Sequence, residues 1–158
     1  MSWLAQVAIT VTLALSSGFS SGPASAAGGL RGQTVYVPVY SEISYGERRT
    51  TLNVGITLSV RNTDRRNALR IARVDYHSSN GKFIRAYQPE PVSLAPLAAA
   101  EYVITGGDRS GGTAASFIVE WDSATPVSIP VIEAVMIGAA SMSGVSFTSV
   151  GRVLEERP

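Results

Sequence analysis

The sequence contains no cysteine and a single histidine, and these two shortages exclude several kinds of site. Without cysteine the chain forms no disulfide and carries no lipid on an N-terminal cysteine. Zinc is disfavoured, because its sites draw on several cysteine, histidine or carboxylate ligands. A nucleophilic triad would depend on His77, and the adjacent Ser78 and Ser79 do not complete one, because successive strand residues point to opposite faces. We therefore expect a protein that is not an enzyme and that holds no cofactor.

Charged residues are also scarce, and their signs nearly cancel. They make up 16% of the chain, and 13 basic against 12 acidic residues leave a formal net charge of +1. So small a charge creates no long-range field that would gather nucleic acid, which excludes nucleic acid as a partner. Hydrophobic residues reach 45%, enough to offset the conformational entropy lost when a single domain of this length folds.

The N-terminal segment has the pattern of an export signal. An apolar run from Leu4 to Leu15 precedes the small-residue motif Ala24-Ser25-Ala26, which signal peptidase accepts. The run is too short to cross a bilayer, so the mature chain is not expected to span the membrane. The sequence thus predicts a signal peptide over residues 1–26, a short flexible segment over 27–33 and a folded domain over 34–158. We expect the mature protein to be periplasmic or secreted after cleavage near Ala26.

Period-two alternation of apolar residues predicts strands in the first half of this domain. The clearest case is residues 52–61, where five apolar residues alternate with five that are polar or small. Residues 34–40 alternate similarly, and a proline within them, which cannot donate a ladder hydrogen bond, predicts an edge strand. Residues 69–76 and 82–87 flank Asn80-Gly81, which predicts a hairpin with a type I′ turn.

The second half continues in the same way. Three prolines between residues 89 and 96 predict that the chain crosses from one sheet to the other. The segment from Val131 to Met142 also permits a helix, although its β-branched residues favour a strand. The remaining strands are expected over residues 101–105, 115–122, 129–137 and 145–154. Together the segments predict an all-β fold, an immunoglobulin-like two-sheet β-sandwich of about seven or eight strands.

Six ordered blocks of the sequence resemble one known family. They are residues 35–42, 57–64, 74–76, 117–121, 132–138 and 144–148. With these blocks the chain is similar to a bacterial family of exported proteins called domain of unknown function 3124. The resemblance implies export and a shared fold, and it supplies no mechanism because the family has no established activity.

Two groups of residues are candidates for a binding surface. The first, from two turns that we expect to lie side by side, consists of Tyr40, Ser41, Glu42, Asn62 and Asp64. Arg61 opens the second, a run of arginines that ends at Arg73 and either grips an anion or forms a solvated turn. We expect a non-catalytic binding or envelope-accessory module whose partner is an envelope protein or another component of the cell envelope.

Further candidates are isolated residues. Asp108 lies in a glycine-rich loop that either contributes to a calcium site or serves as a flexible connection. Glu133 shares a strand face with apolar residues, so we expect a buried carboxylate that either pairs with an arginine or acts as a general acid. A copper site built from Met136, Met142 and His77 carries the alternative function, that of a periplasmic small-ligand or metal-binding protein.

Overall fold

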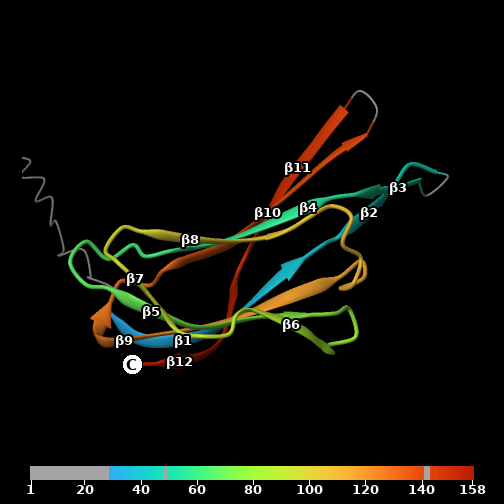
Figure 1. The fold of residues 1–158 in the computed structure, drawn as a ribbon. Coiled ribbons are helices and arrows are strands. Elements are labelled where there is room, and N and C mark those ends of the chain that lie inside the picture. Colours follow the sequence, from blue (N-terminus) through green and yellow to red (C-terminus); the bar gives the residue numbers. More distant parts are fainter. Residues whose placement is uncertain (1–28, 48–49, 141–142) are drawn as a thin grey trace, which may run out of the picture.

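The computed structural model describes residues 29–47, 50–140 and 143–158, which fold into two facing β-sheets and a separate hairpin (Figure 1). Its strands are β1 (Leu30–Val39), β2 (Glu42–Tyr45), β3 (Thr50–Asn53), β4 (Gly55–Arg61), β5 (Leu69–His77), β6 (Phe83–Gln88), β7 (Val92–Leu94), β8 (Ala99–Ile104), β9 (Ala115–Val127), β10 (Val131–Ala140), β11 (Ser143–Val150) and β12 (Arg152–Arg157). The predicted leader lies outside the described residues. Within them, no helix is long and apolar enough to cross a bilayer.

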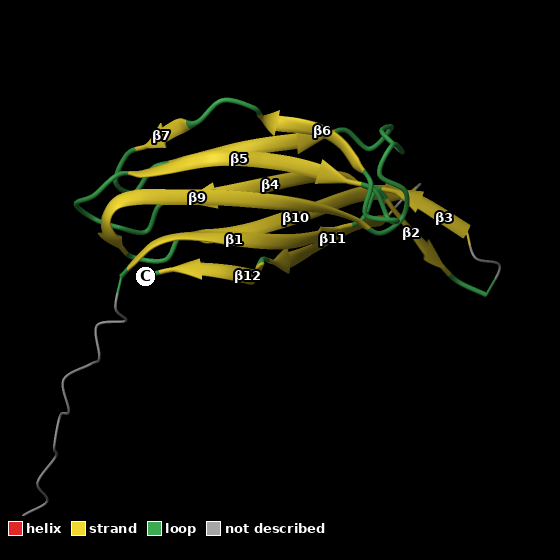
Figure 2. Ribbon diagram, turned by 90° about the horizontal axis from the view of Figure 1, so that it is seen from below, coloured by secondary structure: helices red, strands yellow, loops and turns green. Residues whose placement is uncertain are grey.

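The two sheets are antiparallel and stack as layers. The first sheet has the order β12-β1-β9-β5-β6, with β7 also paired to β5, and the second has the order β11-β10-β4-β8. Strands β2 and β3 pair only with each other and project from one end of the sandwich (Figure 2). The predicted all-β two-sheet sandwich is confirmed, although the described residues form twelve strands rather than seven or eight.

Apolar side chains on the facing sides of the sheets form one core. Because strand residues alternate between faces, each long strand contributes every second residue to it. From the first sheet come Val35, Val37, Val39, Leu69, Ile71, Val74, Tyr76, Phe117, Val119 and Trp121. From the second sheet come Ile56, Leu58, Val60, Tyr102, Ile104, Ile132, Ala134 and Met136.

Two predicted strands are each divided in the structure. The segment 52–61 breaks at Val54, between β3 and β4, so its start belongs to the projecting hairpin. The segment 145–154 breaks at Gly151, where the chain leaves the second sheet and joins the first as β12. A Cβ atom on Gly151 would lie 2.6 Å from Cγ1 of Val35, so only glycine fits where the chain passes between the layers.

Two local predictions about the first sheet were wrong. Strand β1 is not an edge strand, because it pairs with both β9 and β12. The pairing of β1 with β12 ends at Tyr36. Pro38 lies beyond the end of this pairing, so its missing N–H removes no hydrogen bond between β1 and β12. The hairpin between β5 and β6 is present, but only Gly81 has positive φ, whereas a type I′ turn requires it at two residues.

Two other predictions are confirmed. Residues 131–140 form strand β10 and not a helix, as their β-branched side chains favour. The proline-rich segment carries the chain from β7 in the first sheet to β8 in the second.

Candidate functional site

The two turns that were expected to lie side by side occupy opposite ends of the sandwich. The amide of Val54 donates to the carbonyl of Ser41 (3.0 Å), which places Ser41 at the start of β4. Asn62 follows the last residue of that strand, Arg61. Seven strand residues at about 3.3 Å each separate the two turns by about 23 Å, so the expected neighbourhood of Tyr40–Glu42 and Asn62 is wrong.

Asn62 is a buried structural residue. Its side-chain Nδ2 donates to the carbonyls of Asn67 (3.0 Å), Leu94 (3.1 Å) and Ala95 (3.0 Å), and its Oδ1 accepts from the amide of Asp64 (2.9 Å). One side chain therefore ties the β4–β5 loop to the β7–β8 loop. With every polar atom of its amide engaged inside the protein, it offers a ligand nothing to bind.

Asp64 organises the same end. Oδ1 accepts from the amides of Arg66 and Asn67 (both 2.8 Å), and Oδ2 accepts from the amide of Ser128 (3.0 Å). These backbone hydrogen bonds stabilise the carboxylate and lower its pKa from 3.8 to about 2. Like Asn62, it holds loops together.

Glu133 does not have the burial expected of it. Its side chain lies half-buried on the outer face of the second sheet, because the core face of β10 carries Ile132, Ala134 and Met136 instead. Arg61 lies on the same outer face, exposed, and its Nε donates to the hydroxyl of Ser59 (3.0 Å). Neither residue forms an ion pair within the part of the chain that the structure describes.

The copper hypothesis is not supported by the placement of its residues. Met136 is fully buried in the core, whereas His77 lies on the outer face of the opposite sheet. Met142 falls outside the described residues. Among residues 29–47, 50–140 and 143–158, no three histidine or carboxylate side chains are close enough to hold a metal ion.

The other end of the sandwich, which we call the loop end, joins two segments that are far apart in sequence. The turn at residues 78–82 meets the loop at residues 105–114, where the amide and hydroxyl of Ser79 both donate to the carbonyl of Gly111 (2.8 and 3.0 Å). The hydroxyl of Ser79 in turn accepts from the amide of Ala114 (3.0 Å). Ser41 donates to the carbonyl of Gly112, so the predicted residues Ser41 and Asp108 do share this end.

Two adjoining hollows lie between this turn and this loop, and together we call them the loop-end cleft. Their volumes are about 540 and 360 Å³. Both are lined by Ser78, Asn80 and Ser110; Lys82 and Phe83 line the larger, and Ser79, Arg109, Gly111 and Gly112 line the smaller. The cleft therefore combines hydroxyl and amide groups, two cations and one exposed aromatic ring.

Asp108 stabilises the loop, and both of its carboxylate oxygens accept hydrogen bonds from the protein. Its Oδ1 accepts from the amide of Ser110 (2.9 Å), and its Oδ2 accepts from Arg85. Hydrogen bonds from Ser110, together with the charge of Arg85, lower the pKa of the Asp108 carboxyl. Cζ of Arg85 also lies 5.3 Å from the ring centroid of Tyr87. Arg85 therefore links Asp108 in the loop to the aromatic residues at the edge of the core.

A cluster of packed aromatic rings lies against the loop. The ring of Tyr76 lies 5.2 Å from that of Phe117 and 6.1 Å from that of Tyr87. Burial raises the pKa of Tyr76 to about 12. A Cβ atom on Gly111 would lie 2.0 Å from the Tyr76 hydroxyl, so the loop rests directly on this ring.

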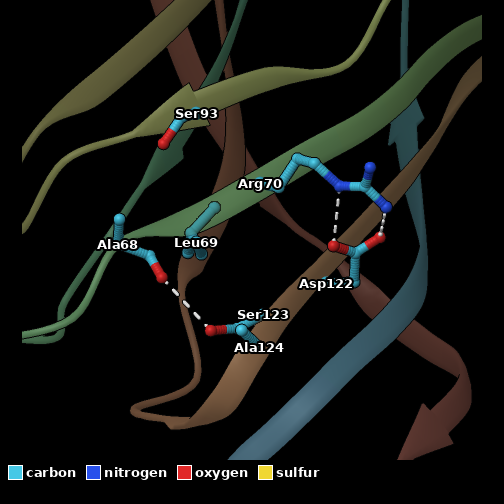
Figure 3. A pocket seen from close by; sticks show the side chains of 7 residues that line it. All are labelled: Ala68, Leu69, Arg70, Ser93, Asp122, Ser123 and Ala124. Atoms are coloured by element: carbon cyan, nitrogen blue, oxygen red, sulfur yellow. Dashed lines mark hydrogen bonds and ion pairs between the residues drawn. The ribbon is translucent and has the colours of Figure 1, made fainter.

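Two further hollows lie elsewhere on the described residues. One, of about 420 Å³, contains the ion pair between Arg70 and Asp122 (2.6 and 2.8 Å) and a hydrogen bond from Ser123 to the carbonyl of Ala68 (Figure 3). Its charges neutralise each other, which leaves little for a ligand. The other, of about 320 Å³, is an apolar groove beside Gly151.

Sequence reasoning missed a cluster on the outer face of the first sheet. His77 lies opposite Ser116 on β9, and Asp75 lies two residues before it on the same face. Oδ1 of Asp75 and Nδ1 of His77 are buried without hydrogen-bond partners in the described chain. The cross-strand register that brings Ser116 to His77 has no local signal, since 39 positions separate the two residues in the sequence.

Comparisons with known proteins give this chain a family. A family model described as protein of unknown function (DUF3124) matches residues 32–154, most of the chain. The chain belongs to this family. The DUF3124 chain matches no curated protein. Among solved structures it is similar to "Crystal Structure of Thermotoga maritima 1070", with 14% identity, a TM-score of 0.47 and coverage of 82% of this chain and 98% of that one.

Proposed function

We propose that this DUF3124 protein is an exported, non-catalytic module that binds an anionic saccharide of the cell envelope in the loop-end cleft. The proposal depends on one observation. Two cationic side chains line the adjoining hollows together with polar groups, and neither cation forms an ion pair with an acidic residue in the described chain. Neither Lys82 nor Arg109 forms an ion pair within the described residues. Both cations therefore remain able to neutralise a ligand's charge.

The remaining groups of the cleft suit a sugar. The hydroxyl of Ser78 donates to Oδ1 of Asn80, so its oxygen can accept from a saccharide hydroxyl and Nδ2 of Asn80 can donate to one. The hydroxyl of Ser110 contributes less, because it already accepts from Arg85 (3.3 Å). Phe83 is exposed and adds apolar surface next to them. Loops carried by a rigid sandwich commonly provide binding sites of this kind.

The position of the cleft is well determined by the fold. The hydrogen bonds of Ser79 and the contact of Gly111 with Tyr76 hold the turn and the loop in register. A site that is formed before the ligand arrives loses less entropy on binding.

Binding is tested by isothermal titration calorimetry with a uronic-acid oligosaccharide, a phosphorylated oligosaccharide and their neutral counterparts. We expect binding of at least one anionic probe that weakens with added salt, because cations at a surface are screened. Replacing Lys82 and Arg109 together by glutamine should weaken it at least tenfold. The matched control replaces Arg65 and Arg66, exposed at the opposite end, by glutamine and should bind like wild type. No binding, or an equal loss in both variants, would disprove the site.

Export is tested separately. The apolar run and the small-residue motif of the leader support it. Fractionation of the native host followed by N-terminal sequencing should find a mature chain that begins at Ala27. A full-length chain confined to the cytosol would contradict export without bearing on the cleft.

A further inference from the structure

Strand β10 is apolar on both of its faces, which is unusual in an antiparallel sandwich. Ile132, Ala134 and Met136 face the core, and Val131, Val135 and Ile137 face outward with only Glu133 among them. A sheet with one face in water normally alternates apolar and polar residues, whereas a sheet covered on both sides does not. The sequence of β10 is therefore that of a strand covered on both faces.

The outward residues of the neighbouring strands extend this apolar face. The strand register aligns Val103 of β8, Thr57 of β4, Val135 of β10 and Thr148 of β11 in one row across the sheet. All four are β-branched. In the described structure Val103 is 59% exposed, Ile137 61% and Val150 70%, so no described element covers the face, as Figure 1 also shows for the layer containing β8, β4 and β10. We call this surface the outer valine face.

The size of the outer valine face matches a modest protein interface. Four strands spaced about 4.8 Å apart and seven residues of about 3.3 Å each give about 440 Å² in plan. The apolar groove beside Gly151, lined by Val131, Val150 and Val153, continues it at one end. Two copies facing each other would bury about 900 to 1,200 Å² in total, at the lower end of specific interfaces.

The charges on the face indicate which partner covers it. It carries two acidic residues, Glu101 and Glu133, and one basic residue, Arg61, so its net charge is small and creates no field for a strongly charged partner. A two-fold dimer requires a surface that is complementary to itself, and an apolar face with both signs has this property, since Arg61 of one copy can approach Glu133 of the other.

We propose that the outer valine face is the interface of a homodimer in which the second sheets of two copies pack against each other. Interfaces this small are usually weak and transient, so we expect a dissociation constant in the micromolar range. Sedimentation velocity of the mature chain from about 1 to 300 µM should therefore show a monomer that converts to a dimer. A wild-type protein that stays monomeric across this range would overturn the proposal.

Single substitutions locate the interface. Val103→Glu and Val150→Glu each add a charge that a dimer would bury beside its symmetry mate, so each should raise the dissociation constant at least tenfold. Both side chains are mostly exposed in the single chain, so circular dichroism and the unfolding midpoint of the monomer should not change. The matched control is Leu154→Glu, which introduces the same charge on β12 of the first sheet, where Leu154 is 56% exposed, and should dimerise like wild type. A dimer that survives both substitutions, or that is lost equally in the control, would place the interface elsewhere.

Discussion

Replacing Asn62 by alanine tests whether this residue holds the fold together. The substitution removes the hydrogen bonds by which the two hydrogens of Nδ2 are shared among the carbonyls of Asn67, Leu94 and Ala95, and one that Oδ1 accepts from the amide of Asp64. Each lost hydrogen bond costs about 1 kcal/mol, and a carbonyl left buried without a partner costs more. Because water reaches some of the freed groups, we expect a loss of about 2 to 4 kcal/mol. That is a large part of the roughly 5 to 15 kcal/mol that stabilises an ordinary domain.

The assay is urea denaturation of the mature chain, followed by the fluorescence of the buried Trp121 and by circular dichroism. The control is Asn53→Ala, the same substitution at an exposed residue whose Oδ1 accepts one hydrogen bond from Arg109 (2.9 Å), and it should cost about 0.5 kcal/mol or less. Equal midpoints for the two variants would refute the structural role. A stable Asn62→Ala protein that had lost a ligand would instead restore Asn62 as a binding residue.

Three further predictions follow from the core, the opposite end and the loop end. Leu58→Asp buries an unpaired carboxylate at a fully buried position and should prevent folding; a soluble variant with a native circular dichroism spectrum would contradict the position of β4 in the core. The folded pKa of Asp64, about 2, lies below its ordinary 3.8, so the carboxylate stabilises the fold fully above about pH 4, and this contribution is lost as the pH falls through 2. Asp64→Asn should therefore have a lower melting temperature than wild type at neutral pH, and this difference in melting temperature should disappear between about pH 4 and pH 2. A difference that does not change with pH would argue against the hydrogen bond from Ser128. Gly111→Ala should cost about 1 to 3 kcal/mol because its Cβ would overlap the Tyr76 hydroxyl, and Tyr76→Phe in the same chain should recover part of the loss in thermal melts; equal melting of Gly111→Ala and wild type would show that the loop does not rest on the ring.

Sequence periodicity predicted the fold well because alternation is a local property. The strand over residues 115–122 and the β5–β6 hairpin follow from side chains and turn residues that are neighbours in sequence. The same reasoning cannot detect where a strand changes sheets. Gly151 ends one strand and starts another because Val35, 116 positions earlier, leaves no room for a side chain there.

The candidate site was only partly predictable, for the same physical reason. The polar turn at residues 78–81 and the glycine-rich loop around Asp108 are each visible in the sequence. Their contact is not, because the hydrogen bonds from Ser79 to Gly111 join residues 32 positions apart. Asn62 was predicted to be a binding residue and is instead structural, because the carbonyls near its Nδ2 belong to loops that only the folded chain brings together.

The contrast between the two ends of the sandwich supports a function at the loop end. At the opposite end, the side chains of Asn62 and Asp64 form hydrogen bonds with backbone groups of the loops. These bonds satisfy polar groups that would otherwise be unpaired and so stabilise the domain. At the loop end, Ser79 and the ion pair between Asp108 and Arg85 hold the turn and the loop in place. The cations Lys82 and Arg109 are not needed for it as ion-pair partners, and they line a hollow that the fold has already shaped. Cations that form no ion pair among the described residues and that line a preformed cleft are expected to contact an anionic ligand, although Arg109 also donates a hydrogen bond to Asn53 (2.9 Å).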